Sequence, residues 1–190
     1  MSTNSIELKR LVSKYKYLQQ ELEYFNELRG EYERDFKQNI IESGYEFIIP
    51  IISSGDTQNE ESAVSDQLPT KFKKLFRKIV SLTHPDKLKD EDEKTILELR
   101  TMYETAVNAS QDGEKGVLII IAIELGIDVE DFKDEIEEID IACNKIKKQI
   151  DEFCKRSSYY WYNLKTDKEK DKFMKKFIDS SLKHNNIKKK

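Results

Sequence analysis

Apolar side chains recur every three or four residues over two long stretches of this chain, and this spacing constrains the fold more than any other feature of the sequence. The first stretch lies within residues 5–43 and consists of Leu8, Leu11, Tyr15, Leu18, Leu22, Phe25, Tyr32 and Phe36. The second extends over more than four heptads and consists of Phe132, Ile136, Ile139, Cys143, Ile146, Ile150, Phe153, Ser157, Tyr160 and Leu164. Such a period is typical of helices that pack along a coiled-coil seam, so we predict two long helices.

The composition points to an all-α fold. Only 6 glycines and 3 prolines occur among the 190 residues, which is too few for the many turns of a β-sandwich or barrel. Charged residues make up 37% of the chain, as much as the hydrophobic residues do. This balance suits helices with long solvated faces. We therefore expect an all-α protein.

Shifts in composition divide the chain into five segments. Residues 1–48 form the N-terminal long helix. Residues 49–68 contain Pro50 and a polar, acidic stretch without periodicity, which predicts a flexible linker. A helical hairpin is expected over residues 69–112, a helical and coiled-coil region over 113–183, and a basic tail over 184–190.

Proline and acidic residues mark the two helices of the hairpin. Pro69 suits the first turn of a helix over residues 69–83. Pro85 ends that helix, because the residue before a proline is pushed out of the helical region. The second helix should start near Asp90, with Glu93 completing a capping box, and stop near Gly113.

Further capping signals organise the C-terminal region. Residues 115–125 predict a short apolar helix that Gly126 closes. Asp128 is expected to cap the second long helix, which then carries the regular seam. Thr166 and Glu169 form a capping box that opens a last helix.

The apolar runs and the cysteines bear on location. Residues 47–52 and 117–127 are far shorter than the ~20 residues of a membrane span, and the N-terminus lacks the apolar core of a signal peptide. Cys143 and Cys154 lie about 16 Å apart on one predicted helix, which is too far for a disulfide. We therefore expect reduced thiols and a cytoplasmic location. The alternative for the cysteines is a disulfide between the two chains of a parallel dimer. The alternatives for the location are the nucleus and a virion.

The sequence His84-Pro85-Asp86 lies where the hairpin should turn. Between Lys71 and Lys89 there are seven Lys or Arg residues and one acid, in a chain whose net charge is −4. A basic amphipathic helix therefore ends abruptly at an exposed tripeptide, and a second amphipathic helix follows. Such a charged face implies an acidic partner surface.

This stretch resembles the J domain of the DnaJ-type co-chaperones over residues 69–110. That family places His-Pro-Asp between its second and third helices, behind a Lys/Arg-rich helix, docks on a 70-kDa heat-shock chaperone of the DnaK type and stimulates ATP hydrolysis there. The resemblance implies that His84, Pro85 and Asp86 are the signalling loop. It implies an electrostatic docking face made of Lys73, Arg77 and Lys78, with Lys87 just beyond the loop.

The resemblance extends to packing positions and has one departure. Phe76 stands where the family often has Tyr, and Tyr103 matches the Tyr of an Ala-Tyr pair in its third helix, with Met102 in place of the Ala. A polar linker replaces the family's first-helix signature. The place of the family's first helix is taken by the N-terminal helix, by the C-terminal region, or by no segment of this chain. Some bacterial J-domain proteins have an aromatic block similar to residues 159–162.

The sequence contains no recognisable catalytic motif. The chain has two histidines, His84 and His184, and lacks zinc-ligand spacing, a nucleophile elbow and a phosphate-binding glycine loop. We expect no catalytic residue, no cofactor and no metal. The net charge and the pI near 5.5 argue against a nucleic-acid partner.

Two functional hypotheses remain, with a weaker third. The first is a J-domain co-chaperone with a J-like antiparallel hairpin flanked by long coiled-coil-type helices. The alternative is a structural coiled-coil protein with a degenerate J-like fold, such as a component of a large DNA virus. The third is a nucleic-acid protein that uses the lysine-rich helix and the tail. The seam over residues 132–164 packs either on residues 5–43 of the same chain or on a second copy as a homodimer.

Overall fold

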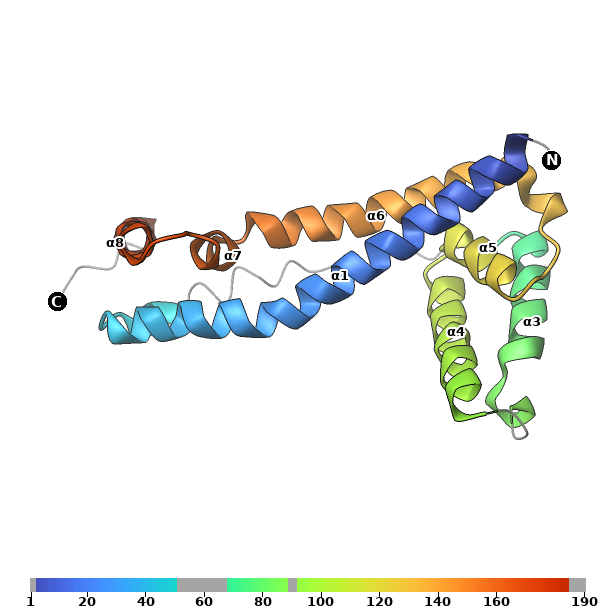
Figure 1. The fold of residues 1–190 in the computed structure, drawn as a ribbon, viewed down its shortest axis with the longest axis horizontal. Coiled ribbons are helices and arrows are strands. Elements are labelled where there is room, and N and C mark those ends of the chain that lie inside the picture. Colours follow the sequence, from blue (N-terminus) through green and yellow to red (C-terminus); the bar gives the residue numbers. More distant parts are fainter. Residues whose placement is uncertain (1–2, 51–67, 89–91, 185–190) are drawn as a thin grey trace. The chain divides into compact units, whose positions relative to one another are not determined.

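The computed structural model describes residues 3–50, 68–88 and 92–184, and within these ranges the chain is helical and contains no strand (Figure 1). The prediction of an all-α fold is confirmed. The α-helices are α1 (Thr3–Glu42), α3 (Thr70–Thr83), α4 (Glu93–Gln111), α5 (Lys115–Glu124), α6 (Ile136–Lys155), α7 (Ser157–Tyr162) and α8 (Asp167–His184). Short 3-10 turns are η1 (Glu46–Ile48), η2 (Pro85–Lys87) and η3 (Glu130–Glu135). Most of the predicted linker over 49–68 lies outside the described residues.

Glycine ends two of the helices where the sequence predicts it. Gly113 and Gly126 follow α4 and α5 with φ angles of 72° and 70°. This left-handed backbone lets the next amide donate back into the helix: Glu114 N–H to the Ala109 carbonyl at 2.8 Å, and Ile127 N–H to the Ala122 carbonyl at 2.8 Å. Each bond satisfies a carbonyl that the end of the helix would otherwise leave unpaired.

One predicted N-terminal cap is confirmed and another is wrong. The Thr166 hydroxyl accepts the Glu169 N–H at 3.3 Å while the Glu169 carboxylate accepts the Thr166 N–H at 3.1 Å, so the capping box opens α8. By contrast, α4 begins at Glu93 behind Asp92 and not near Asp90. The Asp92 carboxylate accepts the Thr95 hydroxyl at 2.6 Å and two backbone amides. This hydroxyl bond is the main reason that the pKa of Asp92 is lowered.

Contacts between the helices divide the chain into two compact units. The first comprises Met1–Gln19 and Ser62–Lys147, and the second comprises Gln20–Glu61 and Lys148–Lys190. The two long helices, α1 and α6, each contribute residues to both units. The units are described separately below.

The first unit is built around α5. Helices α3, α4 and α5 pack against one another, and every residue of α5 from Gly116 to Ala122 is buried. The backbone of α6 also reaches α5: a Cβ added at Gly116 would lie 2.5 Å from the Glu138 carbonyl carbon and 2.9 Å from the Ile139 nitrogen. Only glycine allows so close an approach of the two helices.

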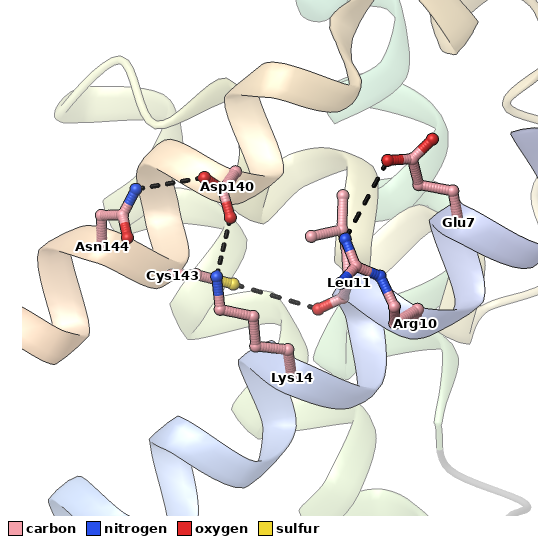
Figure 2. Close-up of polar contacts among 7 residues, drawn as sticks. All are labelled: Glu7, Arg10, Leu11, Lys14, Asp140, Cys143 and Asn144. Atoms are coloured by element: carbon pink, nitrogen blue, oxygen red, sulfur yellow. Dashed lines mark hydrogen bonds and ion pairs between the residues drawn. The ribbon is translucent and has the colours of Figure 1, made fainter.

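In the same unit, the N-terminal part of α1 packs on α6 (Figure 2). Cys143 is fully buried, with its Sγ 3.9 Å from the carbonyl oxygen of Leu11, itself 4% exposed. Lys14 Nζ donates to Asp140 Oδ1 at 2.7 Å, and the Asn144 amide donates to Asp140 Oδ2 at 3.2 Å. The apolar seams of α1 and α6 therefore meet within one chain in this unit, and the Lys14–Asp140 ion pair lies beside them.

The Lys14–Asp140 pair should make stability depend on pH. The hydrogen bond from Lys14 is the largest cause that lowers the pKa of Asp140. A lowered folded pKa stabilises the protein above the unfolded value of 3.8, and this stability is lost as the pH falls through the folded pKa. We expect Asp140→Asn to lower the unfolding free energy at pH 7 by under about 1 kcal/mol, because the pair is half exposed. Urea denaturation at pH 7 and below pH 3.8 measures this.

The difference between Asp140→Asn and the original protein should shrink toward zero in acid. Asp151 provides the control, since it is exposed on the same helix and has no ion pair among the described residues. Asp151→Asn should have little effect at either pH. An Asp140→Asn difference that stays constant with pH would contradict the assignment.

The core of the second unit is aromatic and aliphatic. Its fully or nearly fully buried members are Phe36, Ile40, Ile48, Trp161, Met174, Ile178 and Leu182. The Phe36 ring lies 5.6 Å from Trp161 and 5.0 Å from Phe177, both edge-on, the geometry that aromatic pairs prefer. Trp161 is therefore a core residue, whereas Tyr160 next to it is 57% exposed.

The second long helix is shorter than predicted. A single helix was expected from Asp128 through Leu164, but η3 precedes α6, and Phe132 within η3 has a non-helical backbone. The Asp128 carboxylate accepts the Glu130 N–H at 2.9 Å in a local turn, so Asp128 does not cap the long helix. A second break falls at Arg156, which has an extended ψ of 137°.

A long-range contact accompanies the break at Arg156. Its guanidinium donates to Glu33 of α1 at 3.0 Å and lies 5.3 Å from the centre of the Phe153 ring. Ser157, the weakest member of the predicted seam, follows directly and starts α7. The change of direction brings Tyr159 within 5.6 Å of Phe25 and 5.7 Å of Tyr32, measured between ring centres.

The described part of the chain contains two cysteines and no candidate membrane span. Cys143 is buried and Cys154 is exposed, and both are free thiols. Within the described ranges, no helix combines the length and the apolar character that crossing a bilayer requires.

Candidate functional site

The tripeptide His84-Pro85-Asp86 follows the last residue of α3. Pro85 forces His84 into an extended backbone with φ −61° and ψ 128°, so the helix ends at Thr83. Pro85, Asp86 and Lys87 then form the single turn η2. Thr83 before the tripeptide is fully buried and Leu88 after it is 5% exposed, so the turn is anchored at both ends.

Solvent reaches the tripeptide within its unit. The Asp86 side chain is 85% exposed and that of His84 is 40% exposed, and Pro85 is exposed as well. Two helices lead to and from this turn, and they pack against each other. The turn therefore presents one imidazole and one carboxylate at the end of a packed helix pair.

The imidazole of His84 is held from two sides. The Asp86 backbone N–H donates to His84 Nδ1 at 3.3 Å, and Asp86 Oδ2 lies 3.7 Å from the same nitrogen. Because Nδ1 accepts this bond, the proton of the neutral ring is on Nε2. The Tyr103 ring of α4 packs edge-on against the imidazole, with ring centres 5.5 Å apart and planes at 80°. These contacts hold the ring in place at the surface of the turn.

Lys87 contributes to the local structure of the turn. Its Nζ donates to the Ser81 carbonyl at 2.9 Å, one of the carbonyls that the end of α3 leaves without a helical partner. A cation at a helix C-terminus also interacts favourably with the helix dipole. Lys87, expected just beyond the signalling loop, therefore has its side chain bonded to α3.

The opposite faces of α3 differ sharply. Phe72, Leu75, Ile79 and Thr83 are buried, and the solvent face of the helix carries Lys73, Lys74, Arg77 and Lys78. In the part of the chain that the structure describes, none of these four cations forms an ion pair. The three predicted docking residues among them, Lys73, Arg77 and Lys78, therefore share one unneutralised surface that leads to the tripeptide.

Lys71 belongs to the same charged run but not to that surface. It pairs with Glu135 and lies 5.6 Å from the centre of the Phe132 ring. Lys71 is therefore part of the packing between α3 and η3, a role that its place in the sequence did not reveal.

Two contributors to the site were missed in the sequence. Ser81 supplies the carbonyl for Lys87, and buried Thr83 donates its hydroxyl to the Ile79 carbonyl at 3.0 Å. The signal available for Thr83 was a threonine at an apolar position of the helix. Leu82, which helical spacing groups with the apolar residues of this helix, is instead 49% exposed.

The described residues place the candidate site at the surface of the first unit. They contain no group of three or more His, Cys, Asp or Glu side chains arranged to hold a metal ion. The site consists of an exposed polar turn beside a row of cations, on an all-helical scaffold. Comparison of the chain with protein-family models, with curated proteins and with solved structures gave no match.

Proposed function

We propose that this protein is a J-domain-type co-chaperone. His84, Pro85 and Asp86 contact a DnaK-type heat-shock chaperone, and Lys73, Arg77 and Lys78 steer the encounter with an acidic surface on that partner. ATP hydrolysis takes place on the partner, so the chain itself is not an enzyme and needs no cofactor.

One observation supports this proposal most directly. The tripeptide is exposed at the turn between two packed helices, and the first of those helices carries a cationic face that forms no ion pair with any other described residue. We interpret α3 and α4 as the J-like antiparallel hairpin (Figure 1). In this interpretation α5 takes the place of the family's missing first helix, because it packs on both members of the pair.

The test is the steady-state ATPase rate of a DnaK-type chaperone with and without the full chain. We expect the chain to raise the rate and His84→Gln to abolish the increase, because glutamine cannot reproduce the ring contact with Tyr103 or the bond at Nδ1. His184→Gln is the matched control: it replaces the other histidine, which is exposed at the end of α8, and should leave stimulation intact.

The same assay separates this proposal from its alternative. If folded protein stimulates none of several chaperones, the scaffolding hypothesis is favoured. Circular dichroism of each variant establishes that it is folded. Equal stimulation by His84→Gln and by the unmodified chain would remove the tripeptide from the mechanism.

A further inference from the structure

A second cationic surface lies on α8, far from the tripeptide in sequence. Helix α8 contains six lysines and four acids, which gives it a net positive charge in a chain of net charge −4. Its apolar residues Met174, Ile178 and Leu182 are buried in the core of the second unit. The charged residues therefore occupy the side of the helix that faces solvent.

Five of the lysines are exposed and share that side. At 100° per residue they fall within about a third of the helix circumference and span about 22 Å along its axis. They are Lys168, Lys172, Lys175, Lys176 and Lys183, called here the α8 lysine stripe. Within the described residues none of them forms an ion pair.

The remaining lysine and one acid of α8 are engaged elsewhere. Lys170 lies over the Trp161 ring, 4.9 Å from its centre. The Glu169 carboxylate is occupied by the backbone N–H and the hydroxyl of Thr166 in the capping box. Of the acids in α8, Asp179 falls within the same third of the helix circumference. The stripe therefore has a net positive charge, with five lysines against one acid.

An exposed aromatic ring flanks the stripe. Tyr160 of α7 is 57% exposed, and its ring lies 5.2 Å from that of Phe173 in α8. Lys176 follows Phe173 by three residues, so the two are neighbours on the helix surface. A supported tyrosine beside a row of lysines combines the two elements that single-stranded nucleic acid needs: a face for base stacking and cations for the phosphates.

Other classes of partner fit this surface less well. Interfaces between proteins are depleted in lysine and enriched in arginine, methionine and aromatic residues, whereas the described part of α8 exposes no large apolar side chain. Insertion into a lipid surface requires a free apolar helix face, and that face of α8 is buried. We propose that the α8 lysine stripe and Tyr160 bind single-stranded nucleic acid through its phosphates and bases, without sequence specificity.

This inference is independent of the co-chaperone proposal and revises the expectation drawn from net charge. The acidic pI of the whole chain argued against a nucleic-acid partner. That average conceals the charge of α8, because 33 of the 37 acids lie outside it. Beyond the described residues the sequence continues with Lys188, Lys189 and Lys190, which are also positively charged.

The experiment is fluorescence anisotropy of the full chain with a labelled 20-nucleotide single-stranded DNA of mixed sequence, titrated between 50 and 200 mM salt. We expect binding that weakens with salt. Lys168→Gln/Lys172→Gln/Lys176→Gln should reduce the slope of log affinity against log salt by about 2, since each lost phosphate contact removes about 0.7. Tyr160→Ala should weaken binding about tenfold and leave the slope unchanged.

A charge-matched control makes the assignment specific. Lys9, Lys147 and Lys155 are exposed outside α8 and have no ion pair among the described residues. Replacing these three with Gln changes the net charge equally and should leave the slope intact. An equal loss of slope in this control, or no binding of the DNA at 50 mM salt, would overturn the proposal. Equal affinity for labelled poly-glutamate of matched length would also overturn it, in favour of an acidic protein partner.

Discussion

Replacing Gly116 with alanine should destabilise the first unit by about 3 kcal/mol or more. The added Cβ would lie 2.5 Å from the Glu138 carbonyl carbon and 2.9 Å from the Ile139 nitrogen. Both atoms belong to the backbone of α6, so no side-chain rotation can relieve the overlap. The helices must separate, and the buried residues on either side lose their packing. Urea denaturation followed by far-ultraviolet circular dichroism measures the change.

The sign of this effect is diagnostic, because the same substitution normally stabilises a helix. Gly30 lies inside α1, is exposed, and has nothing within 4 Å of an added Cβ. Gly30→Ala should therefore raise stability by roughly 0.5–1 kcal/mol. If both variants gained stability, the close approach of α5 and α6 would be wrong.

Truncating Phe36 to alanine should destabilise the second unit by about 3–5 kcal/mol. The side chain is 4% exposed and contacts both Trp161 and Phe177 edge-on. Its removal leaves a cavity next to Trp161, which is the only tryptophan in the sequence. Tryptophan fluorescence during urea denaturation therefore reports on this core directly, and the midpoint should fall.

Phe47 is the control for size and hydrophobicity. It is 47% exposed, and its ring lies 6.1 Å from Tyr45. Phe47→Ala should change the unfolding free energy by about 0.5 kcal/mol or less, as surface substitutions usually do. Equal losses for Phe36→Ala and Phe47→Ala would show that the Phe36 contacts do not form the core of this unit.

Local signals in the sequence were sufficient to predict where most of the helices begin or end. The Thr166–Glu169 box and Gly126 act within a few residues, so their chemistry can be read without tertiary information. For α4 the capping-box pattern selected Asp90, whereas the cap is Asp92. The Thr95 hydroxyl favours Asp92, and this hydroxyl bond was not part of the pattern used.

Contacts between distant residues explain the remaining errors. Arg156 bonds to Glu33, 123 residues away, where a continuous seam predicted an unbroken helix. At the candidate site, the tripeptide and the cationic face of α3 follow from order and spacing alone. The contact between His84 and Tyr103 depends on how α3 packs on α4. The difference between Lys71, which is paired, and Lys73, which is not, depends on where η3 places Glu135.

The burial of α5 in the folded protein implies that the same segment is exposed while the chain is being synthesised and folded. Residues Val117 through Ile123 form an uncharged, largely β-branched heptapeptide, the kind of sequence that assembles into intermolecular β-structure when exposed. Its helical neighbour α6 is synthesised after it, so this segment leaves the ribosome before all of its cover exists. Lys115 and Glu124 flank it as charged gatekeepers, and fragments that end before α6 will be prone to aggregate.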